Sequence, residues 1–309
     1  MVNGQGYEGA TSRASARTTV LLFLFGALLT ALYWRIVPDM VRQWWDDPNY
    51  SHGFLVPFFS GYLVWAGRDR LRVLLSRSPS PSPFPPKGRG EHRGSGAWLL
   101  VLLAGLGKLI LGDVGAENWL MRSSLIVILA GLVLFHLGSS VLRQLSFPLV
   151  FLLFMVPLPA ILFYAVTFPL QNLAAHNAAW TLDLFGIPVL LDGNVLHLSR
   201  ITLGVTEACS GVRSLISLLA LAMAWAYITL DSRWAMAVLV ASALPITIAA
   251  NAARIVSTGL IGQWFGASYA QGFFHSFSGW LIFLVAFVAL LAVHGLIRLV
   301  GLVRPWRTA

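Results

Sequence analysis

The sequence has little charge and only one cysteine. Charged residues make up 11% of the chain and apolar residues 57%, whereas about a quarter of the residues in a soluble domain are charged. This composition excludes an ordinary soluble protein and indicates a polytopic membrane protein. The single cysteine, Cys209, excludes an internal disulfide. No internal repeat and no soluble domain is recognisable, so we expect residues 1–309 to form one membrane domain.

Long apolar stretches define the fold class. A stretch of about 20 apolar residues crosses a bilayer as a helix, and the sequence has about eight candidates, of which the second and third are short. The predicted fold is an all-α, polytopic membrane helical bundle. We expect its spans at residues 18–37, 53–67, 97–112, 121–138, 147–167, 211–230, 234–256 and 277–297.

Lysine and arginine are unevenly distributed between the two sides of these spans. Fourteen of them lie in alternate segments and six in the segments between. The positive-inside rule then places both termini in the cytoplasm, and segments 39–52 and 168–210 outside. The net charge of +9 is explained by this asymmetry, so we expect no nucleic-acid partner.

Three segments outside the spans have a recognisable character. Residues 76–96 consist of Pro, Ser, Gly and basic residues, which cannot bury a core, so we predict a disordered cytoplasmic loop. Residues 170–185 mix apolar and polar side chains in the manner of a helix lying on the membrane surface. Residues 197–204 alternate moderately and predict a short strand or hairpin arm leading to Cys209.

Polar side chains gather at one predicted end of three consecutive spans. Cys209 and Arg213 lie at the outer start of the sixth span, Asn251 and Arg254 at the outer end of the seventh, and His275 at the outer start of the eighth. An arginine within a span is costly and usually faces a partner or a wet cavity. The convergence of these residues on one membrane face indicates a functional site.

The residue types at this face permit acyl transfer. A thiolate attacks a carbonyl, an imidazole passes a proton to the leaving amine, and a guanidinium stabilises the oxyanion. Arg213 follows Cys209 by four residues on the same helical face, and an arginine and a helix N-terminus both favour the thiolate. Taken singly, the alternatives are an inert buried cysteine, an arginine that reaches the headgroups and an interfacial histidine.

Two further residues are candidates for a supporting role. Glu207 either caps the start of the sixth span or pairs with an arginine. Asn251 lies three residues before Arg254 and either orients the guanidinium or a substrate carbonyl, or makes an interhelical hydrogen bond. The histidines are scattered and lack the spacing of metal ligands, so we expect neither a metal nor a cofactor.

Four motifs resemble those of the exosortase/archaeosortase family and match its pattern without departure. The resemblance covers the chain from about residue 20 to residue 297. The motifs are EACSGVRS at 207–214, NAARI at 251–255, HSFSG at 275–279 and DPNYSHGFLVP at 47–57.

The resemblance implies an enzyme, a cysteine peptidase or transpeptidase of the bacterial inner membrane. Its catalytic residues are expected to be Cys209, Arg254 and His275, with Arg213, Glu207 and Asn251 as supporting or substrate-binding residues. The resemblance further implies cleavage of a C-terminal PEP-CTERM sorting signal at the periplasmic face, through a thioacyl intermediate on Cys209. The expected partners are PEP-CTERM proteins and membrane lipids, and transfer to an acceptor and hydrolysis both stay open.

Two other classes of function stay open. A transporter would use Arg213 and Arg254 to bind an anion, and would have polar residues and broken helices near the midplane of several spans. A non-catalytic partner of an envelope or exopolysaccharide export system would use Cys209 only for packing. In that case Cys209→Ser would leave function intact.

Overall fold

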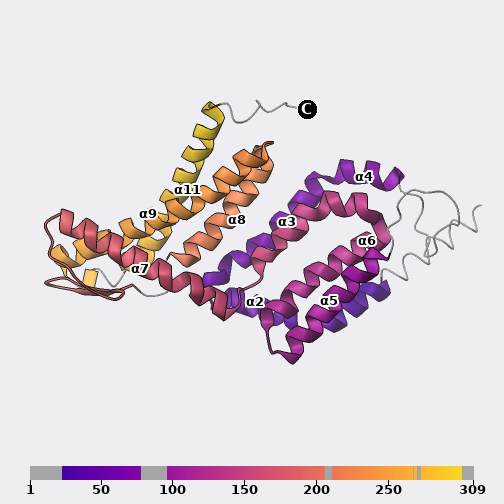
Figure 1. Ribbon diagram of the computed structural model, residues 1–309, viewed down its shortest axis with the longest axis horizontal. Coiled ribbons are helices and arrows are strands. Elements are labelled where there is room, and N and C mark those ends of the chain that lie inside the picture. The colour runs from indigo at the N-terminus through magenta and orange to yellow at the C-terminus, as the bar shows by residue number, and fades with distance from the viewer. Residues whose placement is uncertain (1–22, 78–95, 206–210, 267, 270–272, 301–309) are drawn as a thin grey trace, which may run out of the picture. The chain divides into compact units, whose positions relative to one another are not determined.

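The fold is taken from a computed structural model that describes residues 23–77, 96–205, 211–266, 268–269 and 273–300, with only the backbone at 273–276. The predicted loop 76–96 lies outside the described residues except at its two ends. The contacts of the chain divide it into two compact units, Met1–Pro159 and Ala160–Ala309, and each is described by itself (Figure 1).

The first unit is helical. Its described residues begin with a helix at Phe23–Tyr33, which meets the next helix, α2, at an angle of 56°. The elements from α2 onward are α2 (Ile36–Asp46), η1 (Pro48–Phe54), α3 (Leu55–Ala66), α4 (Arg68–Arg77), α5 (Ala97–Val114), α6 (Asn118–Phe151) and η2 (Leu152–Met155).

The helix α6 reverses direction at Gly138. This glycine has φ +84° and ψ 175°, which is a non-helical, positive-φ conformation that favours glycine. Arg122 donates from Nη1 to Oε1 of Gln43 at 2.5 Å, and the carbonyl of Met155 accepts from Nε1 of Trp44 at 2.8 Å. A straight helix would separate Arg122 from Met155 by about 50 Å, so the two could not contact the neighbouring residues Gln43 and Trp44. The second half of α6 therefore runs in the opposite direction to the first, as Figure 1 shows.

Glycines let α5 and the first half of α6 approach closely. A Cβ at Gly105 would lie 2.6 Å from Ile128, one at Gly112 would lie 2.7 Å from Met121, and one at Gly131 would lie 2.7 Å from Leu102. Small residues at the contact allow the backbones of membrane helices to pack against each other. The α5–α6 pair is therefore held together by close backbone packing.

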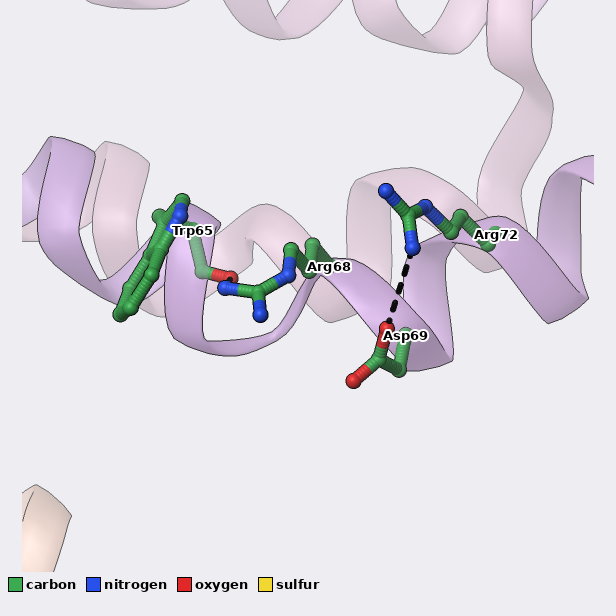
Figure 2. A network of polar contacts seen from close by, with 4 residues as sticks. All are labelled: Trp65, Arg68, Asp69 and Arg72. Carbon is green, nitrogen blue, oxygen red and sulfur yellow. Dashed lines mark hydrogen bonds and ion pairs between the residues drawn. The ribbon is translucent and has the colours of Figure 1, made fainter.

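The short helix α4 carries positive charge directly after an aromatic helix end. Arg68 lies over the ring of Trp65, with its Cζ 4.3 Å from the ring centroid, and Arg72 pairs with Asp69 at 3.5 Å (Figure 2). Both members of the Arg72–Asp69 pair are exposed, so it adds little stability. An aromatic residue followed by arginines is typical of a membrane–water boundary.

Within its described residues, the second unit combines four long helices with a small sheet. Its helices are α7 (Ala160–Leu184), α8 (Val212–Thr229), α9 (Arg233–Phe265) and α11 (Phe273–Leu299). Its strands are β1 (Leu190–Asp192), β2 (Val195–His197) and β3 (Thr202–Gly204), antiparallel in the order β1-β2-β3. The predicted strand or hairpin arm at 197–204 is thus confirmed.

Two apolar clusters hold the second unit together. One joins the sheet to α7 and α9 through residues such as Leu196, Leu182 and Ile255. The other joins α8, α9 and α11 through Leu218, Leu239 and Leu290, each fully buried. The first cluster fixes the sheet, and hence the end of β3, against the helices.

One predicted span has the wrong boundaries. The stretch 147–167 is interrupted at 156–159, because Pro157 and Pro159 lack N–H groups and disfavour helix in the residues before them. Residues 170–184 are helical as predicted, as the second part of α7, and their position on the membrane surface stays a prediction.

The apolar helices fit a polytopic membrane bundle. By length and composition, five described helices can cross a membrane, and the bent pair at 23–46 would make a sixth, so the predicted number of eight stays a prediction. The five are Ala97–Val114, Asn118–Met155, Val212–Thr229, Arg233–Phe265 and Phe277–Leu299, of which Asn118–Met155 contains the reversal at Gly138.

Candidate active site

The chain that leads to Cys209 is fixed just before it by Asn194. The backbone N–H of Val205 donates to the carbonyl of Asn194 at 2.9 Å, and the Asn194 side-chain amide donates to the Val205 carbonyl at 2.8 Å. Val205 is also buried to 1% exposure in the cluster beneath the sheet. The position of the chain is therefore set four residues before the cysteine.

The chain that follows Cys209 is fixed at Gly211. This residue is the N-cap of α8 and has φ +80° in the left-handed region. A Cβ here would lie 3.2 Å from both Cβ and Cγ of Asn251 on α9. The position therefore requires glycine for its backbone conformation and for the close approach of Asn251.

Arg254 joins α9 to α11. Its Nε donates to Oγ of Ser278 at 3.3 Å, and a Cβ at Gly279 would lie 3.6 Å from its Nη2. The absence of a side chain at Gly279 leaves room for the planar guanidinium against the backbone of α11. In a helix the side chains lean toward its N-terminus, so that Arg254 covers the turn that carries Asn251.

These contacts bring three of the sequence motifs together. Gly211 belongs to the cysteine motif, Asn251 and Arg254 to the second motif, and Ser278 to the histidine motif. Residues of all three line one cavity of about 10 Å³ between α8, α9 and α11. The polar side chains of that cavity are Ser214, Thr247, Asn251 and Arg254.

The remaining predicted residues are placed less completely. Cys209 and Glu207 lie outside the described residues. His275 is the third residue of α11, three positions before Ser278, and only its backbone is described. Arg213 is half-buried in the first turn of α8, and Asn251 is buried on α9.

The fourth motif, at 47–57, folds on itself in the first unit. The Asp47 carboxylate accepts from the backbone N–H of Asn49 at 2.9 Å, and Ser51 donates to the carbonyl of Pro48 at 3.1 Å. Nε2 of His52 pairs with the carbonyl of Phe154 at 3.1 Å, and burial lowers the pKa of this histidine. These side chains bind main-chain groups, which is a structural role.

The described part of the chain shows no cluster of metal-binding side chains. Within it, no three His, Cys, Asp or Glu side chains come together. The polar groups of the cavity are the amide of Asn251, the hydroxyls of Ser214 and Thr247 and the guanidinium of Arg254, all of which can donate hydrogen bonds. Such a set suits a carbonyl oxygen or an oxyanion better than a cation.

Several contacts around the site were not predicted from the sequence. Ser278 lies inside a recognised motif, but its contact with Arg254 needs the packing of α11 on α9. Asn194 belongs to an Asp-Gly-Asn sequence, which signals a tight hairpin turn between strands. The sequence thus contained a turn signal at Asn194. It contained no pattern that would have identified Thr247 or the contact of Ser214 with the cavity.

One protein family matches most of the chain. The sequence profile of the transmembrane exosortase family (Exosortase_EpsH) matches residues 44–292, which include all four motifs. No curated protein and no solved structure matches the chain. The match spans most of the sequence, and the chain therefore belongs to the transmembrane exosortase family, whose members are membrane sorting transpeptidases.

Proposed function

We propose that this protein is a cysteine peptidase or transpeptidase that cleaves the C-terminal, PEP-CTERM-type sorting signal of exported proteins. The observation that carries the proposal is the meeting of three motifs around Arg254. Gly211, two residues after Cys209, packs on Asn251, while Arg254 binds Ser278, three residues after His275. A shared site would explain why these three segments, which are far apart in the sequence, pack against one another.

In the proposed reaction the Cys209 thiolate attacks the scissile carbonyl carbon. A C–S bond forms and the carbonyl electrons move to oxygen, where Arg254 stabilises the negative charge. Collapse of this intermediate breaks the C–N bond, and the proton that the Cys209 thiol gave up passes through His275 to the departing amine. The product is a thioester on Cys209, which water or an acceptor nucleophile then resolves.

The supporting residues act on this set. Asn251 orients the Arg254 guanidinium, three residues further along the same helix. Arg213, one turn after Cys209, lowers the pKa of the thiol or binds an acidic group of the substrate. Glu207 caps the start of α8 or pairs with an arginine.

The charge distribution supports a site on the periplasmic face of the bacterial inner membrane. Arginines follow Trp65 on α4, as expected at the cytoplasmic boundary of a span. Both termini then lie in the cytoplasm. A substrate tail with its basic end in the cytoplasm would enter with its cleavage motif at the face where the three motifs meet.

The test is co-expression of the protein with a tagged PEP-CTERM substrate from the same host. Wild type and Cys209→Ala are compared by gel mobility and by the mass of the new C-terminus, after membrane insertion of both has been checked. Wild type alone is expected to remove the tail, and the mass separates hydrolysis from transfer. Tail removal by Cys209→Ala would refute the nucleophile and favour the transporter or assembly-partner readings.

A further inference from the structure

Thr247 differs from the other threonines of the described helices. A helical threonine can satisfy its hydroxyl by donating to the carbonyl four residues earlier. The hydroxyl of Thr247 is buried, with the residue 4% exposed, and has no hydrogen-bond partner in the described structure. Five others make that backbone bond at 2.7–2.9 Å: Thr30, Thr167, Thr181, Thr229 and Thr258.

Thr247 lines two small cavities. One lies between α7, α8 and α9 and is lined mainly by apolar residues, among them Leu170, Leu215 and Leu244. The other, between α8, α9 and α11, is the cavity of the candidate site. Each measures about 10 Å³, which is the room that one water molecule needs.

Only the second cavity offers hydrogen-bonding partners beyond Thr247 and Asn251. Ser214 enters it from α8 and Arg254 from α9. Thr247, Asn251 and Arg254 stand at positions i, i+4 and i+7, so they share one face of α9. A buried water usually makes about three hydrogen bonds to polar groups, and this cavity supplies that number.

An unsatisfied buried hydroxyl destabilises a protein, whereas one that binds an internal water does not. We propose that the cavity between α8, α9 and α11 is a binding site for one water molecule, held by Thr247, Asn251 and Ser214. Through this water Thr247 positions Asn251, and Asn251 in turn orients Arg254. The positioning role rests on the proposed function of Arg254, but the water site does not.

The direction of a stability change tests the water site. Thr247→Val removes the hydroxyl at nearly constant volume, and it is compared with Thr247→Ser, which keeps the hydroxyl. Thr167→Val is the matched control, since Thr167 is fully buried on α7 and its hydroxyl donates to Phe163 at 2.7 Å. All variants are made in the Cys209→Ala background, and thermal unfolding is followed by tryptophan fluorescence in detergent.

If the cavity holds water, Thr247→Val lowers Tm by about 2–4 °C, as Thr167→Val does, because each loses a satisfied hydroxyl. Thr247→Ser then stays closer to the parent. If the hydroxyl has no ligand, Thr247→Val raises Tm or leaves it unchanged, and the proposal is overturned. A Thr247→Ser variant as unstable as Thr247→Val would also overturn it, because packing would then be the cause.

The processing assay tests the positioning role. With Cys209 restored, Thr247→Val is expected to slow substrate processing about fivefold to tenfold, while Thr247→Ser stays within about twofold. Equal rates for Thr247→Val and wild type would refute positioning. Processing by Cys209→Ala would instead refute the proposed function and leave the result from Tm standing.

Discussion

The two units use equally conspicuous motifs in different ways. In the first unit, three polar side chains of the motif at 47–57 bind main-chain groups: Asp47, Ser51 and His52. In the second unit, motif residues pack on one another, as Gly211 does on Asn251 and Arg254 on Ser278, and they border a cavity.

This difference distinguishes a motif that stabilises the fold from motifs that form a candidate site. A side chain that pairs with a carbonyl of a distant element fixes the fold at that point, as Nε2 of His52 does with Phe154. A guanidinium at the edge of a cavity beside hydroxyl and amide groups can bind a reacting oxygen. Substitutions in the second unit should therefore affect the reaction first, and substitutions in the first unit should affect stability first.

The largest effect is expected from Arg254→Lys. Lysine keeps the charge but lacks the planar guanidinium that binds Ser278 and fits against Gly279. We expect processing to fall at least about a hundredfold with insertion unchanged, measured as the initial rate of tail removal.

The control for this change is Arg200→Lys, at an exposed arginine of the same unit whose Nη1 is 3.5 Å from the carbonyl of Gln263. It should leave the rate within about twofold of wild type. A rate for Arg254→Lys above a third of wild type would show that charge alone is enough.

The next effect is expected from Gly211→Ala. Alanine at φ +80° is strained, and its Cβ would press on Asn251 at 3.2 Å. A Cβ at that distance forces its neighbour to shift by a few tenths of an ångström. Because a misplacement of about 1 Å can cost about a hundredfold in rate, we expect a loss of about tenfold in the same assay.

Gly186→Ala separates the two causes. Gly186 has a similar φ of +74°, but nothing lies within 4 Å of its Cβ position. It should lose about 1–2 kcal/mol of stability with little change in the processing rate of the folded protein. Equal rate losses in both variants would assign the effect of Gly211 to backbone strain alone.

A smaller effect is expected in the first unit from His52→Ala. The change leaves the Phe154 carbonyl without its partner, which costs about 1–3 kcal/mol. Thermal unfolding should begin at lower temperature, while processing per folded molecule stays near wild type. A rate loss larger than the loss of folded protein would bring the first motif into the reaction.

The smallest effect is the pH dependence of stability that His52 confers. Burial lowers the pKa of His52 below 6.5, so the folded protein keeps it neutral while the unfolded chain takes up a proton. Stability is therefore complete above about pH 6.5 and is lost as the pH falls toward the lower folded pKa.

The measurement compares Tm at pH 7.5 and pH 5.5. His52→Gln keeps a donor for Phe154 but does not titrate, so its Tm should fall less than that of wild type. An identical decrease in both proteins would assign the pH dependence to other groups.

Much of the fold was predictable because apolar length and proline are local signals. The helices α8 and α11 closely follow the predicted spans at 211–230 and 277–297. The boundary at 156–159 was missed because the apolar run continues through Pro157. The reversal at Gly138 falls at the end of the predicted span 121–138. Hydrophobicity did not show that the chain turns back within a single residue there.

The site was predictable in its motifs but not in its contacts. Arginine in an apolar helix is rare enough to attract notice, and Arg254 was found in this way. Thr247 was missed because threonine in an apolar helix normally satisfies itself on the backbone, and only packing shows that this one does not. Contacts between helices distant in sequence, such as Arg254 with Ser278, need the assembled fold.

The glycines between α5 and α6 have a consequence for the order of assembly during synthesis. All their close approaches join residues fewer than 30 positions apart, from Gly112–Met121 to Leu102–Gly131. The chain emerges from the ribosome N-terminus first, so this pair can associate in the bilayer before α7 exists. The unit without the candidate site is thus equipped to form first, and the unit that contains the candidate site then folds in a membrane that already holds the α5–α6 pair.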